Sequence, residues 1–246
     1  MRLPRFFIAP EQIEQTRIVI TGEDVRHIAL VLRMKAGDEL LLCDGRGAEF
    51  RVKITAVERA RIVTEVTSRS RAEIREPRIA LFQGLPKSDK MDLIVQKATE
   101  LGVSFIVPLI TERTIVKIRD EEKRVGRWQK IAREAAMQSS RLDIPRVEPV
   151  TGFKDFLRTL NSEPRTLLLM PWEEGGAPIR DVLTGNADAR YVSLFIGPEG
   201  GFSSAEVSAA GVSGFHIVSL GPNILRTETA AIAALAIIGY EFGRKY

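Results

Sequence analysis

The sequence predicts an α/β protein in which a small β-barrel domain precedes a larger domain with a mostly parallel sheet. Short runs that alternate apolar and polar residues dominate residues 1–72, as is typical of half-buried strands. From residue 78 onward, apolar runs alternate with helical patterns, and this order favours a parallel sheet with helical crossovers. Two glycine- and proline-framed segments, residues 196–202 and 220–230, each follow a predicted strand.

The first domain, residues 1–72, is predicted from β-rich runs and one helical stretch at residues 23–31. Glycines punctuate these runs and indicate turns between strands. A polar segment that ends in proline, residues 68–77, is the predicted linker to the second domain, residues 73–246. The predicted strands of the first domain are residues 17–20, 39–43, 48–57 and 62–66.

The second domain is predicted to alternate strands with helices. Ser203 or Ser204 suits the N-cap of its third helix. The last helix is rich in Ala and Ile, so it is apolar enough to be buried or to pack against a partner. The predicted strands are residues 79–84, 105–110, 166–170, 192–196 and 216–220, and the predicted helices are residues 89–101, 121–139, 203–210 and 228–242.

Composition is that of an ordinary globular protein with a mildly basic charge. Of its 246 residues, 44% are hydrophobic and 28% are charged, and the formal net charge is +4. The isoelectric point of about 9.3 permits a nucleic-acid partner and equally fits a basic enzyme. The N-terminus lacks the apolar stretch of a signal peptide, and no run is long enough to span a membrane. We therefore expect a cytoplasmic protein with no membrane partner.

The cysteine and histidine content narrows the chemistry. The single cysteine, Cys43, sits in an apolar run, which favours burial as a small hydrophobic side chain over a nucleophilic role. His27 and His216 are the only histidines, and their apolar surroundings favour structural roles. No Cys/His cluster could hold zinc, so no metal is expected. Without a Ser-His-Asp set, a P-loop or a metal-ligand pair, the chain suits a reaction whose donor is already activated.

The first of the two C-terminal loops reads IGPEGGF, residues 196–202. In open α/β sheets, ligands bind beyond the carboxyl ends of the strands, which makes this loop a candidate ligand site. Gly197, Gly200 and Gly201 permit unusual backbone conformations and the close approach of a ligand. The pattern is neither GxGxxG nor a P-loop, so taken alone it equally fits a plain strand-to-helix turn. Glu199 at its tip could bind a ligand or be solvated.

The second loop reads LGPNILRTETA, residues 220–230. Its apolar residues Ile224 and Leu225 could pack against a flat ring such as adenine. Thr227 suits a helix N-cap and Glu228 suits a first helical turn, and these structural roles fit at least as well as catalysis. Arg226 stands out, because a cation at a helix N-terminus is electrostatically unfavourable and therefore calls for an anionic partner.

Basic residues are concentrated in the middle of the chain. Residues 112–146 contain ten Lys or Arg against six Asp or Glu. Such a run usually forms a solvated face, but a basic strip beside a ligand loop also suits a phosphate backbone.

Ordered motifs along nearly the whole chain resemble the RsmE family of bacterial ribosomal RNA methyltransferases, which belongs to the SPOUT class. The matching segments are PRFF, HIALVLRMKAGD, GLPKSDKMD, QKATELGV, TERT, RWQKIAREAAMQSSR, IGPEGGF and LGPNILRTETA. One departure is Ser88, which stands where the family usually has glycine.

The resemblance implies an enzyme that uses S-adenosyl-L-methionine to methylate ring nitrogen 3 of one uridine in 16S ribosomal RNA. It implies an N-terminal PUA-like barrel that binds RNA and a C-terminal SPOUT α/β domain with a deep trefoil knot. A knot would not follow from chain patterns, since connections in proteins almost never thread loops. The resemblance also implies a homodimer and, as partner, the small ribosomal subunit.

The candidate site residues form three groups, of which the cofactor-binding residues are carried over from the resemblance and the catalytic and RNA-binding residues are hypotheses about their charges and positions. Arg226 would stabilise the developing uracil oxyanion, and Glu199 or Glu228 would take the proton from nitrogen 3. The cofactor-binding residues would be Leu168, Met170, Ile196, Gly197, Pro198, Gly200, Gly201, Leu220, Gly221, Ile224, Leu225, Thr227 and Thr229. The RNA-binding residues would be Arg5, Arg33, Lys35, Lys87, Lys90, Arg113 and Arg141.

Two other functions fit parts of the same pattern. One is a SPOUT enzyme that acts on another RNA, for instance as a ribose 2′-O-methyltransferase on transfer RNA. The other is a non-catalytic RNA-binding module, against which the two intact C-terminal loops argue.

Overall fold

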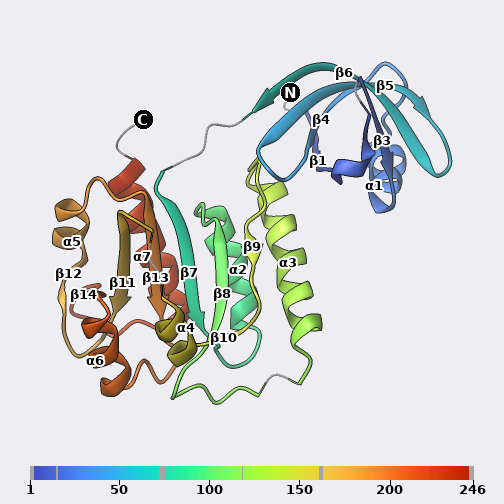
Figure 1. The fold of residues 1–246 in the computed structure, drawn as a ribbon. Helices are drawn as coiled ribbons and strands as arrows, with labels where there is room; N and C mark the ends of the chain where they lie inside the picture. The colour runs from blue at the N-terminus through green and yellow to red at the C-terminus, as the bar shows by residue number, and fades with distance from the viewer. Residues whose placement is uncertain (1–2, 15, 72–75, 118, 161–162, 244–246) are drawn as a thin grey trace. The chain divides into compact units, whose positions relative to one another are not determined.

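The computed structural model describes residues 3–14, 16–71, 76–117, 119–160 and 163–243 (Figure 1). The chain divides into two compact units, Met1–Ile74 with Ala136–Ile144 and Arg75–Ala135 with Pro145–Tyr246. A mixed α/β architecture with a curled N-terminal sheet and a parallel C-terminal sheet confirms the predicted fold class. The predicted boundary at residues 72 and 73 lies outside the described residues.

A curled six-stranded sheet forms the first unit, with the order β1-β4-β5-β6-β3-β2. Neighbouring strands are antiparallel except β1 and β4, which are parallel. The pairing of β5 with β6 shifts register between Arg51 and Val52 and between Ile54 and Ala56, and such bulges bend a sheet. The strands are β1 Arg5–Phe7, β2 Ile13–Glu14, β3 Arg17–Thr21, β4 Glu39–Cys43, β5 Ala48–Val57 and β6 Arg61–Arg71.

The helical stretch predicted at residues 23–31 is α1, Glu23–Arg26, followed by a π-helical turn, His27–Val31. Val25 and Ile28 are buried against the sheet, whereas the side chains at positions 30 and 31 face solvent. A short 3-10 turn, Pro10–Gln12, joins β1 to β2.

The linker predicted at residues 68–77 is wrong over its first residues, because β6 continues to Arg71. These residues pair with the start of β5, from Ala48 to Arg51. Their side chains are exposed, which explains why the segment is polar although it forms a strand. Backbone hydrogen bonds to β5 hold it, and these do not depend on apolar side chains. Residues 72–75 of the predicted linker lie outside the described residues.

The segment Ala136–Ile144 belongs to the first unit although it lies far along the chain. Ala136 packs with Phe7 and Cys43, and Met137, Leu142 and Ile144 lie against this small core. Backbone hydrogen bonds run from Gly47 N–H to the Leu142 carbonyl and from Ile144 N–H to the Gly45 carbonyl, both at 3.1 Å. The first unit is therefore completed by residues that the sequence pattern assigns to the second domain.

The second unit contains a parallel sheet in the order β10-β8-β7-β13-β11-β14-β12, with β9 beside β8. Every recorded strand pair in it is parallel, as the alternation of strands and helices predicts. Its strands are β7 Arg78–Gly84, β8 Phe105–Ile110, β9 Arg146–Val147, β10 Thr151–Gly152, β11 Thr166–Pro171, β12 Ala177–Pro178, β13 Tyr191–Ile196 and β14 His216–Ser219.

Helices cover both faces of this sheet (Figure 1). Leu194 and Ile196 of β13 point into a core shared with α2, α3, α5 and α7, while Phe195 between them packs on the other face with α4 and α6. The helices are α2 Lys90–Glu100, α3 Glu121–Gln138, α4 Phe153–Thr159, α5 Ile179–Gly185, α6 Ser204–Val212 and α7 Thr227–Gly243. The sequence patterns missed α4, α5 and the two-residue strands β9, β10 and β12.

Candidate functional site

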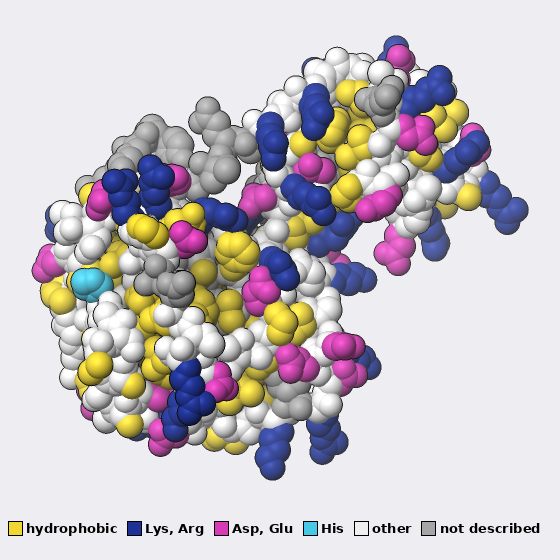
Figure 2. Space-filling view, in the orientation of Figure 1, with side chains coloured by type: hydrophobic (Ala, Val, Ile, Leu, Met, Phe, Trp, Pro, Cys, Tyr) yellow, Lys and Arg dark blue, Asp and Glu magenta, His cyan; other side chains and the backbone are white. Residues whose placement is uncertain are grey.

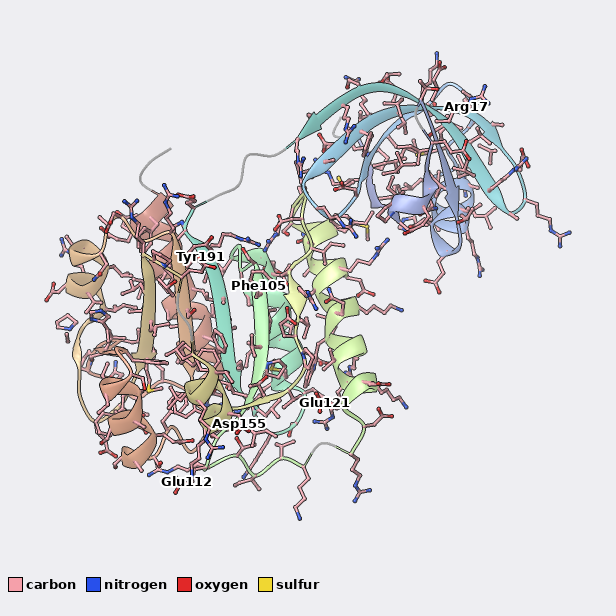
Figure 3. The ribbon with its side chains drawn as sticks, viewed as in Figure 1. Arg17, Phe105, Glu112, Glu121, Asp155 and Tyr191 are labelled. Carbon is pink, nitrogen blue, oxygen red and sulfur yellow. The ribbon has the colours of Figure 1, made fainter. Side chains whose placement is uncertain are left out.

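A cavity of about 400 Å³ opens where β11, β13 and β14 end, at the carboxyl edge of the parallel sheet. In Figure 3, Phe105 and Tyr191 begin β8 and β13 at one end of this sheet, and Glu112, just after β8, lies at the opposite, carboxyl end. Nine predicted cofactor residues line the cavity: Ile196, Gly197, Pro198, Gly201, Leu220, Gly221, Ile224, Leu225 and Thr227.

The structure places the other predicted cofactor residues elsewhere. Leu168 and Met170 alternate along β11 with Leu167 and Leu169, which belong to the core on the opposite face of the sheet. They lie in the apolar core under α4 and α6, 5% and 0% exposed. Gly200 sits on the outer side of its loop, against the Arg113 side chain. Thr229 is exposed on the first turn of α7. A cofactor role for these residues stays a prediction.

The loop after β13, residues 197–201, is fixed from the inner side by two buried polar side chains. The Thr227 hydroxyl donates a hydrogen bond to the Gly197 carbonyl at 2.6 Å, and it accepts one from Gln83 Nε2 at 2.9 Å. Gly84 follows Gln83, and a Cβ added there would stand 2.5 Å from the Pro198 nitrogen. The ends of β7 and β13 thus touch through a glycine that no larger residue could replace without moving the loop.

The same loop is fixed from the outer side by the segment after β8. Arg113 Nη1 donates a hydrogen bond to the Gly200 carbonyl at 2.7 Å. Ser203 is the N-cap of α6, as predicted, and it forms a capping box with the buried Glu206. Glu206 also accepts the Glu112 N–H at 2.8 Å, and Ser203 Oγ donates to Glu112 Oε2 at 2.9 Å. The TERT segment, residues 111–114, therefore clamps the start of α6.

The loop after β14, residues 220–226, carries the apolar part of the cavity wall. Ile224 is 82% exposed, while Leu225 is half-buried beside it. Gly221 has a φ of 126°, and a Cβ added there would meet no atom within 4 Å, so it leaves open space on the cavity wall. This arrangement offers a ligand both exposed backbone and an apolar side chain.

Three charged side chains from three separate segments meet beside the cavity. Lys90 Nζ lies 3.2 Å from Glu199 Oε1 and 3.3 Å from Glu228 Oε2. Glu199 also accepts the Lys87 backbone N–H, at 3.0 and 3.2 Å to its two oxygens. We call Lys90, Glu199 and Glu228 the charged cluster. It brings together the two carboxylates that were candidates for proton transfer.

The electrostatics of the charged cluster favour ionised groups. The hydrogen bond with Glu199 raises the pKa of Lys90 above its ordinary value, against the opposing effect of burial. Burial alone would raise the pKa of Glu199, but its own backbone N–H, the Lys87 N–H and Lys90 together lower it below its ordinary value. Glu199 is therefore a well-stabilised carboxylate and a correspondingly weak base.

Arg226 lines the cavity and its side chain is exposed, directly before the first residue of α7. It is thus placed to meet an anionic ligand group. Trp172 and Glu173 also line the cavity, although neither is among the cofactor-binding residues named from the sequence. Their position directly after β11 at the carboxyl edge is the signal that could have identified both.

Some of the residues predicted to bind RNA are already bound to other groups of the protein, and others are exposed. Arg5 donates to Glu49 and to the Ser140 carbonyl, and its side chain is only 15% exposed. Arg141 pairs with Asp143 and is similarly buried, and Arg113 holds the loop of Gly200. Arg33, Lys35 and Lys87 are exposed, and Lys90 belongs to the charged cluster. On the face in Figure 2, Lys and Arg side chains are interspersed with Asp and Glu.

Cys43 is buried in the first unit, and burial raises the pKa of its thiol to about 12, which opposes a nucleophilic role as predicted. His27 and His216 are exposed. The His27 ring packs edge-on against the Phe6 ring, with 5.5 Å between the two ring centroids. The described residues contain no group of three or more His, Cys, Asp or Glu side chains placed to hold a metal ion. None of the described helices is both long and apolar enough to cross a membrane.

Comparison with known proteins identifies the relatives of this chain. Residues 74–239 match a family described as RNA methyltransferase domain, and residues 20–67 match one described as RNA methyltransferase PUA domain. A Bacillus subtilis protein named ribosomal RNA small subunit methyltransferase E is 34% identical over 250 residues, covering 97% of each chain. The chain belongs to the ribosomal RNA small subunit methyltransferase E family. The resemblance predicted from the motifs is confirmed.

Solved structures of this family extend the match to the fold. The Neisseria gonorrhoeae ribosomal RNA small subunit methyltransferase E, bound to S-adenosyl methionine, has a TM-score of 0.86 at 33% identity, covering 97% of this chain and 98% of that one. A putative methyltransferase from Legionella pneumophila, in complex with the same cofactor, has a TM-score of 0.84 at 34% identity and covers 98% of each chain. Both relatives hold the cofactor on the fold that this chain adopts.

Proposed function

We propose that this protein transfers a methyl group from S-adenosyl-L-methionine to ring nitrogen 3 of a specific uridine in 16S ribosomal RNA. The observation that supports it most is the cavity between the loops after β13 and β14, at the carboxyl edge of a parallel sheet, in a chain whose relatives bind this cofactor. Membership of the ribosomal RNA small subunit methyltransferase E family supports the choice of RNA substrate.

The residues of the cavity suit the proposed cofactor. A volume of about 400 Å³ falls within the range of small-molecule sites. Gly197 and Gly221 would leave backbone groups accessible to adenine and ribose, and Ile224 with Leu225 would cover the ring. The cofactor would supply a methyl group already activated by the sulfonium, so the residues of the cavity would mainly bind and orient it.

The protein would then orient the uridine and manage its proton. Nitrogen 3 of uracil is protonated at neutral pH, so a base must take that proton as the ring becomes the nucleophile. Arg226 would stabilise the negative charge that develops on the uracil oxygens. Glu199 and Glu228 are the candidate proton acceptors, and the lowered pKa of Glu199 makes it a weaker base than an ordinary carboxylate.

The first unit would hold the RNA. Arg33 and Lys35 are exposed and follow three consecutive apolar residues, Leu30, Val31 and Leu32, which are 66%, 68% and 40% exposed. Cations next to exposed apolar side chains suit a nucleic acid, which offers both phosphates and base faces. We propose residues 30–35, at and just after the π-helical turn, as an RNA contact of the first unit, and Lys87 as a separate RNA contact of the second unit. A homodimer is also proposed, on the resemblance alone.

The decisive experiment uses small ribosomal subunits from cells that lack this methyltransferase. The subunits are incubated with the protein and labelled S-adenosyl-L-methionine, and the RNA is digested and analysed by mass spectrometry. We expect 3-methyluridine at one site. A 2′-O-methylated nucleoside obtained from transfer RNA in a parallel reaction would favour the alternative SPOUT activity, and absence of cofactor binding would favour a non-catalytic RNA-binding module.

Arg226→Ala tests the chemistry within the same assay. We expect normal affinity for S-adenosyl-L-methionine and a rate reduced by roughly 10²–10³-fold, the usual cost of one lost oxyanion donor. Calorimetry measures the affinity and single-turnover methylation measures the rate. A wild-type rate in this variant would remove Arg226 from the reaction.

A further inference from the structure

Lys90 occupies an electrostatically unfavourable place, which calls for an explanation. It is the first residue of α2, where the helix dipole repels a cation. Its ammonium nevertheless lies between two carboxylates, 3.2 Å from Glu199 Oε1 and 3.3 Å from Glu228 Oε2. About one third of the side chain is exposed, so it is less available to a phosphate than a free surface lysine.

The two carboxylates depend on Lys90 to different extents. Glu199 keeps two oxygen contacts to the Lys87 backbone N–H without it. Glu228 Oε2 is buried and has no hydrogen-bond partner among the described residues, so the Lys90 ammonium is what offsets its charge there. A buried carboxylate oxygen that loses its cation favours the protonated form.

The three members of the charged cluster also join three elements of the site. Lys90 begins α2, Glu199 is the tip of the loop after β13, and Glu228 lies in the first turn of α7. Lys90 and Glu199 line the cavity themselves. A cation shared by these carboxylates ties the loop after β13 to the start of α7.

We propose that Lys90 is a positioning residue: it ties Glu199 to Glu228 beside the cavity and keeps the Glu228 carboxylate ionised. It does so by bridging the two carboxylates, and it does not contact the RNA backbone. The consequence for activity rests on the proposed function, in which a carboxylate of this cluster accepts the proton of uracil nitrogen 3. The consequence for the Glu228 carboxylate rests on the cluster alone.

Other charged groups near the cluster bear on its titration. Arg226 and Glu173 line the same cavity, Asp89 precedes Lys90, and Arg113 is hydrogen-bonded to the Gly200 carbonyl beside Glu199. These groups are present in every variant below, so differences between variants report Lys90.

The test compares Lys90→Met, which removes the charge at similar length, with Lys90→Arg, which keeps it. Lys97→Met is the matched control, because Lys97 lies on the same helix and pairs with Glu100 away from the site. Side-chain carboxyl carbons are followed by ¹³C NMR as pH changes, and the Glu228 signal is assigned with Glu228→Gln. Loss of the opposite charge in Lys90→Met should move the titration of the Glu228 carboxyl carbon to higher pH than in wild type.

Two further readouts separate positioning from RNA contact. The acid limb of the methylation rate should move to higher pH in Lys90→Met, by the same number of pH units as the titration of the Glu228 carboxyl carbon, because a carboxylate that has lost its cation ionises at higher pH. The slope of log affinity for small subunits against log salt should stay at the wild-type value, whereas a lost phosphate contact lowers it by about one. In Lys90→Arg the acid limb of the methylation rate should return to the pH at which it lies in wild type, and Lys97→Met should behave as wild type in both measurements.

Each outcome decides the proposal. A shallower salt slope with an unchanged Glu228 titration would overturn it in favour of RNA contact. An unchanged titration with an unchanged slope would also overturn it. If wild-type protein makes no 3-methyluridine but the Glu228 pKa rises in Lys90→Met, the proposed function fails and the role of Lys90 in the cluster stands. Should Lys90→Met fold poorly, Lys90→Arg still tests the proposal. Because arginine keeps the positive charge, the Glu228 carboxyl must titrate in Lys90→Arg as it does in wild type, and a different titration would count against the proposal.

Discussion

The two loops that line the cavity differ in how the rest of the chain holds them. The loop after β13 receives hydrogen bonds from Thr227, Arg113 and Lys87, and the Gly84 backbone packs directly against it. The loop after β14 packs on the core through its first residue, Leu220, but its hydrogen bonds within the described part of the chain are local. They are two 3.3 Å contacts between Ser219 and Gly221 and the bond from the Ala230 N–H to the Arg226 carbonyl.

This difference indicates a division of labour. The loop after β13 is the preorganised part of the cavity wall. A ligand binds more tightly to backbone groups that are already in position, because little entropy is lost in ordering them. The loop after β14 exposes the apolar side chain of Ile224, and its hydrogen bonds are local, as is typical of a region that opens at low energetic cost. We therefore expect the first loop to respond to mutation as part of the core and the second to respond only when ligand is present.

The largest effect is expected for Gly84→Ala, which tests the rigidity of the first loop. The new Cβ would lie within 2.8 Å of three atoms of Gly197 and Pro198, including backbone, so the loop must move. We expect a loss of about 1–3 kcal/mol in the free energy of unfolding. Affinity for S-adenosyl-L-methionine should fall at least about tenfold, which corresponds to 1.4 kcal/mol. Chemical denaturation and calorimetry measure the two quantities.

Gly126→Ala is the control for that variant. Gly126 lies in α3, and a Cβ there meets no atom within 4 Å, so the substitution should stabilise by up to about 1 kcal/mol through helix propensity. Wild-type cofactor affinity in Gly84→Ala would show that the first loop adapts as readily as the second and would abolish the comparison.

Thr227→Val should have the next largest effect, because it removes a hydroxyl without changing the shape of the side chain. The Gly197 carbonyl and the Gln83 amide would each lose a buried partner. Leaving a buried polar group unpaired costs about 1–3 kcal/mol, which denaturant unfolding would detect. Thr159→Val, at an exposed hydroxyl in α4, should leave stability within about 0.5 kcal/mol. If the free energy of unfolding falls equally in the two variants, the hydrogen bonds of Thr227 stabilise the protein no more than those of an exposed threonine.

The role of Thr227 shows where sequence reasoning reached its limit. Its position at a helix start predicted an N-cap, but its hydroxyl is used across 30 residues of sequence, at Gly197, and 144 residues away, at Gln83. The periodicity of apolar residues and the residues typical of turns locate the strands, the helices and the two loops, because these elements depend on residues that are neighbours along the chain. Which side chain reaches which loop depends on tertiary distances that no local pattern encodes.

The same limit explains the basic residues. Arg5, Arg113 and Arg141 look equivalent to Arg33 in the sequence, yet the fold binds the first three to carboxylates or carbonyls within their own units. Leu168 and Met170 were selected as cofactor-binding residues, whereas strand alternation turns both into the core. The π-helical turn and the addition of Ala136–Ile144 to the first unit likewise follow from packing alone.

A smaller effect is expected for Arg113→Met, which tests whether this arginine serves the loop or the RNA. Loss of its hydrogen bond to the Gly200 carbonyl should cost about 0.5–1.5 kcal/mol and lower cofactor affinity severalfold. The salt dependence of binding to small subunits should not change. Arg33→Met should do the reverse, with normal cofactor affinity and a salt slope lower by about one. If the two variants exchange these results, Arg113 is the RNA contact and the loop is stable without it.

The smallest effect on the free protein is expected for Ile224→Ser, at a side chain that is 82% exposed. The free energy of unfolding should stay within about 0.5 kcal/mol of wild type, since nothing packs closely on the side chain without ligand. Cofactor affinity should fall about twofold to fourfold, because the apolar area that the ligand would cover is lost. Val212→Ser, at a 92% exposed residue that ends α6, should change neither quantity.

Hydrogen exchange then shows whether the second loop closes. In wild type, amides of residues 221–226 should exchange fast without cofactor and become protected with it, while those of residues 197–201 should be protected in both states. In Ile224→Ser the protection of the second loop should be weaker at saturating cofactor, because the apolar contact that holds it over the ligand is missing. Strong protection of residues 221–226 in the free protein would mean that both loops are rigid, and the cavity would then bind its ligand without any closure.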